Sequence, residues 1–159
     1  VAFDHRQVHA ELVFELAGDR RTTFVETPEE ALTGADVAIT CITRPLEPRL
    51  SAAETSDDAL LLPVDYDDAM AAAAFAEASI FVVDDREQYA VVAARGHYFQ
   101  ELPEPSAELA EVVAGAVSVP ERGRRMFLNM GIAMDDIALG QLVLTRAEER
   151  GVGTRVVFP

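Results

Sequence analysis

Apolar strand-like runs alternate with helix-like segments along this chain, and that alternation constrains the fold more than any other feature. Residues 35–42, 60–64 and 80–83 are almost continuously apolar, as strands buried on both faces of a parallel sheet are. Helix signals lie between such runs; residues 27–30, for example, have the threonine, proline and glutamate of a capping box. We therefore expect an α/β protein with a parallel sheet and right-handed crossovers.

The same patterns set the limits of each expected element. We expect strands at residues 1–3, 22–25, 35–42, 60–64, 80–83, 126–130 and 154–158, and helices at residues 5–17, 27–33, 69–78, 106–114 and 132–150. The last of these helices is the longest, and Ile137, Leu142 and Val143 are among its apolar positions. We expect it to pack on a part of the protein outside this chain and to expose an apolar stripe here.

Length and composition indicate one soluble domain. The chain has 159 residues, of which 50% are hydrophobic and 26% charged, enough for a sizeable core. Its 28 acidic and 13 basic residues give a net charge of −15, and every basic residue is arginine. The absence of lysine excludes a P-loop lysine, a Schiff base and a lysine general base within this chain. The acidity argues against binding nucleic acid or an anionic membrane surface.

The single cysteine and the lack of a targeting pattern further limit the class of protein that we expect. A single cysteine, Cys41, excludes an intramolecular disulfide and a multi-cysteine metal site. Its apolar neighbours predict a buried structural thiol rather than a nucleophile. The sequence has neither a signal-peptide pattern nor a run of about 18 apolar residues, the length of a membrane span. We expect a cytoplasmic protein.

Polar residues follow the expected strands, and in open parallel sheets ligands bind beyond the carboxyl ends of the strands. These residues are Asp4, Thr40 and Thr43, Asp65 and Asp67, Asp84, and Asn129. An aspartate at the position of Asp4 suits the ribose of a dinucleotide and favours NAD over NADP, although Arg6 nearby keeps NADP open. The same aspartate equally fits a helix cap.

Three carboxylates stand within four residues at positions 65–68, directly after an apolar strand. Clustered carboxylates raise one another's pKa, so one of them could serve as a general acid or base near neutral pH. Asp65 and Asp67 could instead bind a divalent cation together with Asp84. A solvated turn with a helix cap is the third interpretation.

An ordered set of short motifs covers nearly the whole chain. It comprises Glu29-Glu30-Ala31, Gly34-Ala35-Asp36-Val37, Phe81-Val82-Val83-Asp84, Glu111-Val112-Val113-Ala114-Gly115, Gly123-Arg124, the segment from Asn129 to Asp136, Arg146-Ala147 and Gly151-Val152-Gly153. In this order and spacing the set resembles the ornithine cyclodeaminase / mu-crystallin family.

The resemblance implies a Rossmann-like parallel sheet, partial here because the first strand and the glycine-rich loop are lacking. It implies that residues 1–131 are the C-terminal portion of the dinucleotide-binding domain. Residues 132–159 would be a helix and strand returning to a second, substrate and dimerisation domain outside this chain. The family binds NAD or NADP, acts on small amino acids or cyclic imines, and forms homodimers.

The resemblance also implies roles for individual residues. Cofactor binding falls to Asp4, Thr40, Thr43, Val64, Asp65 and Asn129, and substrate binding falls to Met130 and Gly131. Asp67 takes the position of the catalytic aspartate, which moves a proton at the substrate amine. Where the family has a glycine two residues before that aspartate, this chain has Asp65. An NAD(P)-binding or accessory protein of the same fold, altered in its catalysis, is therefore the alternative.

Overall fold

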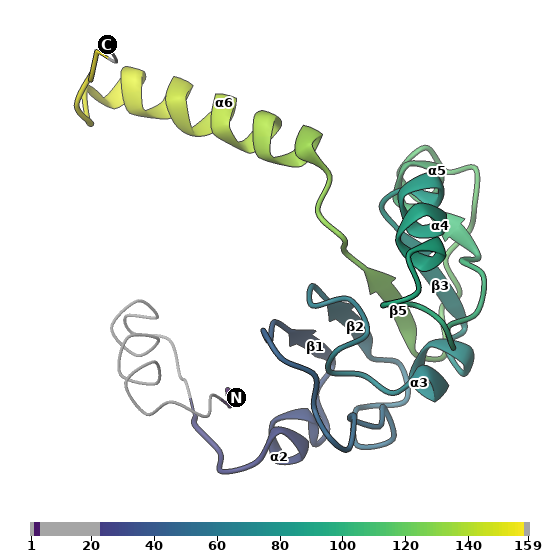
Figure 1. The fold of residues 1–159 in the computed structure, drawn as a ribbon. Helices are drawn as coiled ribbons and strands as arrows, with labels where there is room; N and C mark the ends of the chain where they lie inside the picture. Colours follow the sequence, from purple (N-terminus) through teal and green to yellow (C-terminus); the bar gives the residue numbers. More distant parts are fainter. Residues whose placement is uncertain (1, 4–22, 158–159) are drawn as a thin grey trace.

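The computed structural model describes residues 2–3 and 23–157, and a five-stranded parallel sheet lies at its centre (Figure 1). The strands are β1 (Val37–Thr40), β2 (Leu60–Pro63), β3 (Ile80–Val83), β4 (Ala107–Glu108) and β5 (Arg125–Leu128), arranged in the order β1-β2-β5-β3-β4. A separate parallel bridge joins Ala2 to Phe24. The expected α/β, Rossmann-like parallel fold is thus confirmed.

The helices in the described residues are α2 (Pro28–Leu32), α3 (Ala72–Ala76), α4 (Arg86–Ala94), α5 (Leu109–Val113) and α6 (Ala133–Arg150). The capping box of α2 is present: the Thr27 hydroxyl accepts a hydrogen bond from the Glu30 N–H at 3.2 Å, and the Glu30 carboxylate accepts one from the Thr27 N–H. The expected helix at residues 5–17 and the position of Asp4 lie outside the described residues.

The structure differs from the expected elements in three places. Helix α4 was not expected, although its N-cap, Asp85, accepts a hydrogen bond from the Gln88 N–H at 2.6 Å and was a readable signal. Residues 107–108, expected in a helix, pair instead with β3. Residues 154–157 form no strand, because they pair with no strand of the described chain.

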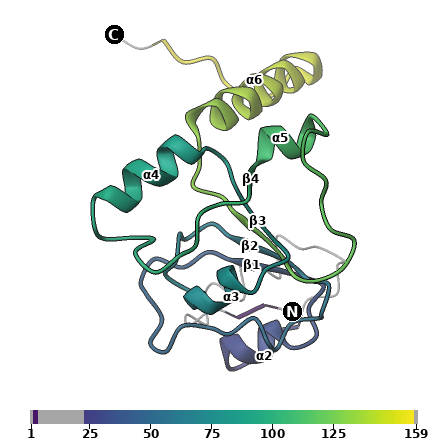
Figure 2. The same cartoon turned by 90° about the vertical axis from the view of Figure 1, so that its right-hand side faces the viewer.

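The two faces of the sheet differ in their cover. Helices α3 and α4 cover one face, where Phe75 and Tyr89 pack in one core cluster with Leu61 and Met126. On the other face α5 reaches only the β3–β4 end, where Ile80 packs with Ala107 and Val112. In Figure 2, α4 and α5 lie on opposite sides of the strands.

Strand β1 corrects the expectation of a strand buried on both faces. Ala38 is buried, whereas Val37 and Ile39 are 54% and 65% exposed. The alternation arises because β1 packs on the core with one face only, while no described element covers the other. Cys41, expected to be a buried thiol, is exposed just beyond this strand.

Helix α6 leaves the carboxyl end of β5 and projects from the sheet (Figure 1). None of its 18 residues is buried. Ile137, Leu142 and Val143 are 72%, 53% and 59% exposed, which confirms the expected exposed apolar stripe. No described helix is long and apolar enough to span a membrane.

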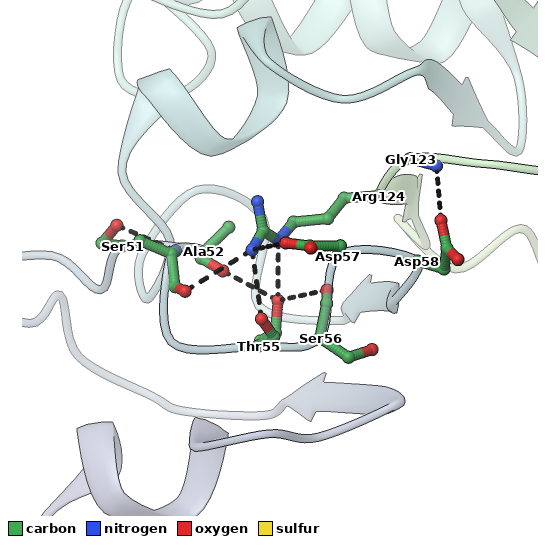
Figure 3. A network of polar contacts seen from close by, with 9 residues as sticks. Ser51, Ala52, Thr55, Ser56, Asp57, Asp58, Gly123 and Arg124 are labelled. Atoms are coloured by element: carbon green, nitrogen blue, oxygen red, sulfur yellow. Dashed lines mark hydrogen bonds and ion pairs between the residues drawn. The ribbon is translucent and has the colours of Figure 1, made fainter.

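A polar network ties the loops at the amino ends of β2 and β5 (Figure 3). The Asp58 carboxylate accepts hydrogen bonds from the Gly123 N–H at 2.8 Å and from the Arg122 guanidinium at 2.6 Å. The Arg124 guanidinium donates to the Thr55 hydroxyl at 3.0 Å and to the Thr55 carbonyl at 3.1 Å. Gly123 and Arg124 thus hold the sheet together at the edge opposite the strand ends where ligands are expected.

Candidate functional site at the carboxyl edge of the sheet

The carboxyl ends of the parallel strands place several of the predicted site residues beside one another. Past the end of β2, the Val64 N–H donates a hydrogen bond to the Thr40 carbonyl at 2.9 Å, and the Asn129 N–H donates one to the Pro63 carbonyl at 3.0 Å. Thr40, Val64 and Asn129 therefore lie along one edge formed by β1, β2 and β5. This edge is where ligands bind in open parallel sheets.

Asp65 fastens the loop after β1 to the loop after β2. Its carboxylate accepts hydrogen bonds from the Thr40 hydroxyl at 2.8 Å and from the Ile42 N–H at 3.0 Å. Burial raises the pKa of Asp65 above its usual value, and these two hydrogen bonds partly oppose that rise. The Asp65 side chain therefore points into the protein. A ligand at this edge would meet the backbone of Asp65 and not its carboxylate.

Asp67 lies deeper than a solvated turn would place it, being 5% exposed. One carboxylate oxygen is 3.4 Å from an Arg49 guanidinium nitrogen and accepts a hydrogen bond from the Phe99 N–H, also at 3.4 Å. The other oxygen, Oδ1, is buried without a hydrogen-bond partner in the described residues. Burying this oxygen costs desolvation free energy that no hydrogen bond offsets. Groups of this kind are often found at acid–base and ligand-binding sites.

Asp84 joins the end of β3 to the segment that leads into α6. One of its oxygens accepts hydrogen bonds from the Met130 and Gly131 N–H groups, both at 2.8 Å. The other oxygen is buried and has no partner among the described residues. Burial raises the pKa of Asp84, against the lowering effect of the two N–H groups. The predicted substrate residues Met130 and Gly131 are thus held in place by a carboxylate.

The remaining predicted residues lie at the margin of this edge or outside the described chain. Thr43 is exposed in the loop after β1, and Val64 is 42% exposed. Asp4 lies outside the described residues.

The carboxylates do not converge on a cation. Asp65 turns toward Thr40, Asp67 toward Arg49, and Asp84 toward the start of α6. Within residues 2–3 and 23–157 no group of three or more histidine, cysteine, aspartate or glutamate side chains is placed to hold a metal ion. The metal site considered from the sequence is not formed by these residues.

Sequence reasoning missed the partners of Asp67. Arg49 and Phe99 are 18 and 32 residues away from it, and no local pattern links them. It also missed that Tyr66 and Phe99 adopt left-handed backbone conformations, with φ of 61° and 64°. Neither residue is the glycine that usually marks such a position.

Comparison with known proteins extends these observations. No protein-family model matches the chain. A curated relative, the nodulation efficiency protein NfeD of Rhizobium meliloti, is 26% identical over 137 residues, which are 84% of this chain and 42% of that protein.

Solved structures match the fold over nearly the whole chain. The Δ(1)-pyrroline-2-carboxylate reductase of Thermococcus litoralis, in complex with NADH and L-proline, matches 97% of this chain with a TM-score of 0.68 and 23% identity. An archaeal alanine dehydrogenase dimer with bound NAD matches 99% with a TM-score of 0.65 and 23% identity. A probable ornithine cyclodeaminase from Bordetella pertussis Tohama I matches 84% with a TM-score of 0.59 and 21% identity.

The chain spans about half the length of these solved structures, between 45% and 52%. At these identities the matches establish the fold and leave the activity open. The fold they share with this chain is the Rossmann-like fold expected from the sequence.

Proposed function

We propose that this chain is the cofactor-binding part of an NAD(P)-dependent oxidoreductase or cyclodeaminase that acts on a small amino acid or cyclic imine. One observation carries the proposal: the predicted cofactor residues Thr40, Val64 and Asn129 lie together at the carboxyl edge of a parallel sheet, where dinucleotides bind in such folds. Similar structures hold NADH or NAD, and one of them also holds an amino acid.

The residues at this edge fit a dinucleotide. An aspartate in place of the family's glycine would repel the cofactor if its carboxylate faced outward. The Asp65 carboxylate instead faces Thr40 and the Ile42 N–H. Val64 and Thr43 remain exposed to contact a bound cofactor. Asp4 would hold the adenosine ribose, which favours NAD over NADP.

Asp67 is the proposed catalytic residue. The bound nicotinamide would supply or accept a hydride, and Asp67 would move a proton at the substrate nitrogen. The buried, unpartnered Oδ1 of Asp67 supports this role, because it is free to take a hydrogen-bond donor. Arg49, 3.4 Å from Oδ2, would orient the carboxylate. Met130 and Gly131, fixed by Asp84, would contact the substrate.

The chain's organisation is part of the proposal. Residues 1–131 would belong to the dinucleotide-binding domain, and residues 132–159 to a substrate domain through which two copies form a homodimer. The exposed apolar residues of α6 support this division, because they need a covering surface.

The test combines cofactor binding with turnover in the protein produced from its complete reading frame. We expect NADH to bind, and a panel of small amino acids and cyclic imines to yield a substrate. Asp67→Asn should lower the rate at least about 100-fold, the low end for general acid–base catalysis, without weakening NADH binding. Asp57→Asn, at a fully exposed carboxylate, is the control. Near-normal turnover of Asp67→Asn would remove the assigned role.

The alternative is an NAD(P)-binding accessory protein without catalysis. The ion pair between Asp67 and Arg49 favours it, because one oxygen of the carboxylate is already engaged by the protein. NADH binding without turnover of any amino acid or imine in the panel would select this alternative.

A further inference from the structure

A cavity of about 590 Å³ lies beside the predicted catalytic loop, on the side of the sheet that α4 covers. The turn at residues 66–68, the loop around Arg49 and the segment after α4 form its walls. Its volume falls within the range of small-molecule sites. Side chains of both charges line it, and none of them was assigned a ligand above.

Asp68 gives this cavity a negative group. It is 8% exposed, it lines the cavity, and its carboxylate has no hydrogen bond or ion pair with any residue from 23 to 157. Burial and the neighbouring Asp67 and Asp65 raise its pKa, against the attraction of Arg49. A nearly buried carboxylate with no partner is costly. A ligand with an ammonium group would remove that cost.

Arg95 gives the cavity a positive group, and the imidazole of His97 lies beside it in the lining. Both are exposed at the end of α4 and line the same cavity. Across the described chain no carboxylate forms an ion pair with Arg95, whereas Arg49 is occupied by Asp67. The chain as a whole has a net charge of −15 and repels anions. An arginine without an acidic partner beside a cavity can nevertheless bind the carboxylate of a ligand.

The rings of two tyrosines, Tyr66 and Tyr98, also line the cavity. The rings of Tyr66 and Tyr98 meet edge to face, with centroids 4.9 Å apart. Tyr66 also contacts Phe99, with centroids 5.2 Å apart. Tyr66 and Phe99 are the two non-glycine residues with positive φ in the described chain. Backbone strain of this kind concentrates at ligand sites. Of the two strained residues, Tyr66 lines the cavity, and Phe99 packs behind it, 3% exposed.

We propose that this cavity binds a small zwitterion, with its ammonium group on Asp68 and its carboxylate on Arg95. The site is separate from the cofactor edge, and its occupation does not depend on the proposed redox function.

The first experiment measures binding by calorimetry in the absence of any dinucleotide. Glycine, β-alanine and 4-aminobutyrate carry both charges at increasing separation, and propylamine and propionate carry one charge each. We expect one of the zwitterions to bind at least about tenfold more tightly than either singly charged compound, since each of those compounds lacks one of the two charged contacts. Equal binding of zwitterion and propionate, or binding of none of the five, would overturn the proposal.

The second experiment locates the site. Arg95→Gln lies at an exposed position, so the fold is kept, and it should weaken the zwitterion at least about tenfold while leaving propylamine unaffected. Asp68→Asn should weaken the zwitterion and leave propionate unaffected. Arg146→Gln on α6 is the charge-matched control. Unchanged zwitterion affinity in Arg95→Gln would contradict the proposal even if Asp68→Asn failed to fold.

Discussion

At the scale of single residues, the three carboxylates that follow β2 have different surroundings although they are close neighbours in the sequence. Asp65 is bound by two donors, Asp67 shares one oxygen with Arg49, and Asp68 has no partner among residues 23–157. Sequence spacing predicted that the cluster would lie at the end of a strand. Which carboxylate turns inward depends on donors from the loop after β1 and on the loop that carries Phe99, and neither is adjacent in sequence.

One prediction tests the structural role of Asp65. Asp65→Ala leaves the buried Thr40 hydroxyl and the Ile42 N–H without their acceptor, so it should lower the free energy of unfolding by about 2–4 kcal/mol. Urea denaturation measures the change. Asp57, fully exposed and joined to Arg124 only by a surface ion pair at 3.5 Å, provides the control, because Asp57→Ala should stay within about 1 kcal/mol of the parent. Equal losses in the two variants would show that Asp65 does not tie the loops together.

At the scale of elements, pattern reasoning worked where a segment has one strong periodic signal. The strands at 60–63, 80–83 and 125–128 and the long helix α6 were expected within a few residues. Helix α4 was missed because only Tyr89 and Val92 of its nine residues are buried. Strand β4 was missed because its two residues become a strand only by pairing with β3.

The contrast between β5 and α6 yields a second prediction. Met126 in β5 is fully buried and Ile137 in α6 is 72% exposed. In this chain Met126→Ala should cost about 2–5 kcal/mol of unfolding free energy, and Ile137→Ala less than about 0.5 kcal/mol. Thermal unfolding followed by circular dichroism compares the two. A large loss in Ile137→Ala would mean that α6 is covered in solution.

At the scale of the whole molecule, the net charge and the burial of carboxyl groups both lower the stability of the folded state once those groups are ionised. The net charge of −15 opposes the compact state through self-repulsion. Burial raises the pKa values of Asp65, Asp68 and Asp84 above the usual 3.8. Each of these carboxyls holds its proton more tightly in the folded chain than in the unfolded one.

Stability should therefore fall as the pH rises from about 3.8 through the raised pKa values, because in that window the folded state binds more protons. Asp58 and Glu111 are partly exposed and have pKa values lowered from 3.8 and 4.5, so their contribution to stability rises with pH and is nearly complete by pH 5. We expect a higher unfolding temperature near pH 5 than near pH 7.5, measured by calorimetry at constant ionic strength. Asp84→Asn should reduce the difference, and a higher unfolding temperature at pH 7.5 would contradict the assignment.

The sequence by itself determined the class of fold, the parallel sheet and the polar residues at the ends of its strands, because periodicity and capping act over a few neighbouring residues. Only the tertiary structure decided that β1 has an uncovered face, that Asp65 turns inward, and that Asp68 and Arg95 line one cavity. Those outcomes depend on contacts between segments far apart in the chain, since burial and hydrogen-bond partners are set by which elements pack together. Local sequence patterns therefore predicted the polar residues at the strand ends. They did not predict the cavity, because segments far apart in the chain form it.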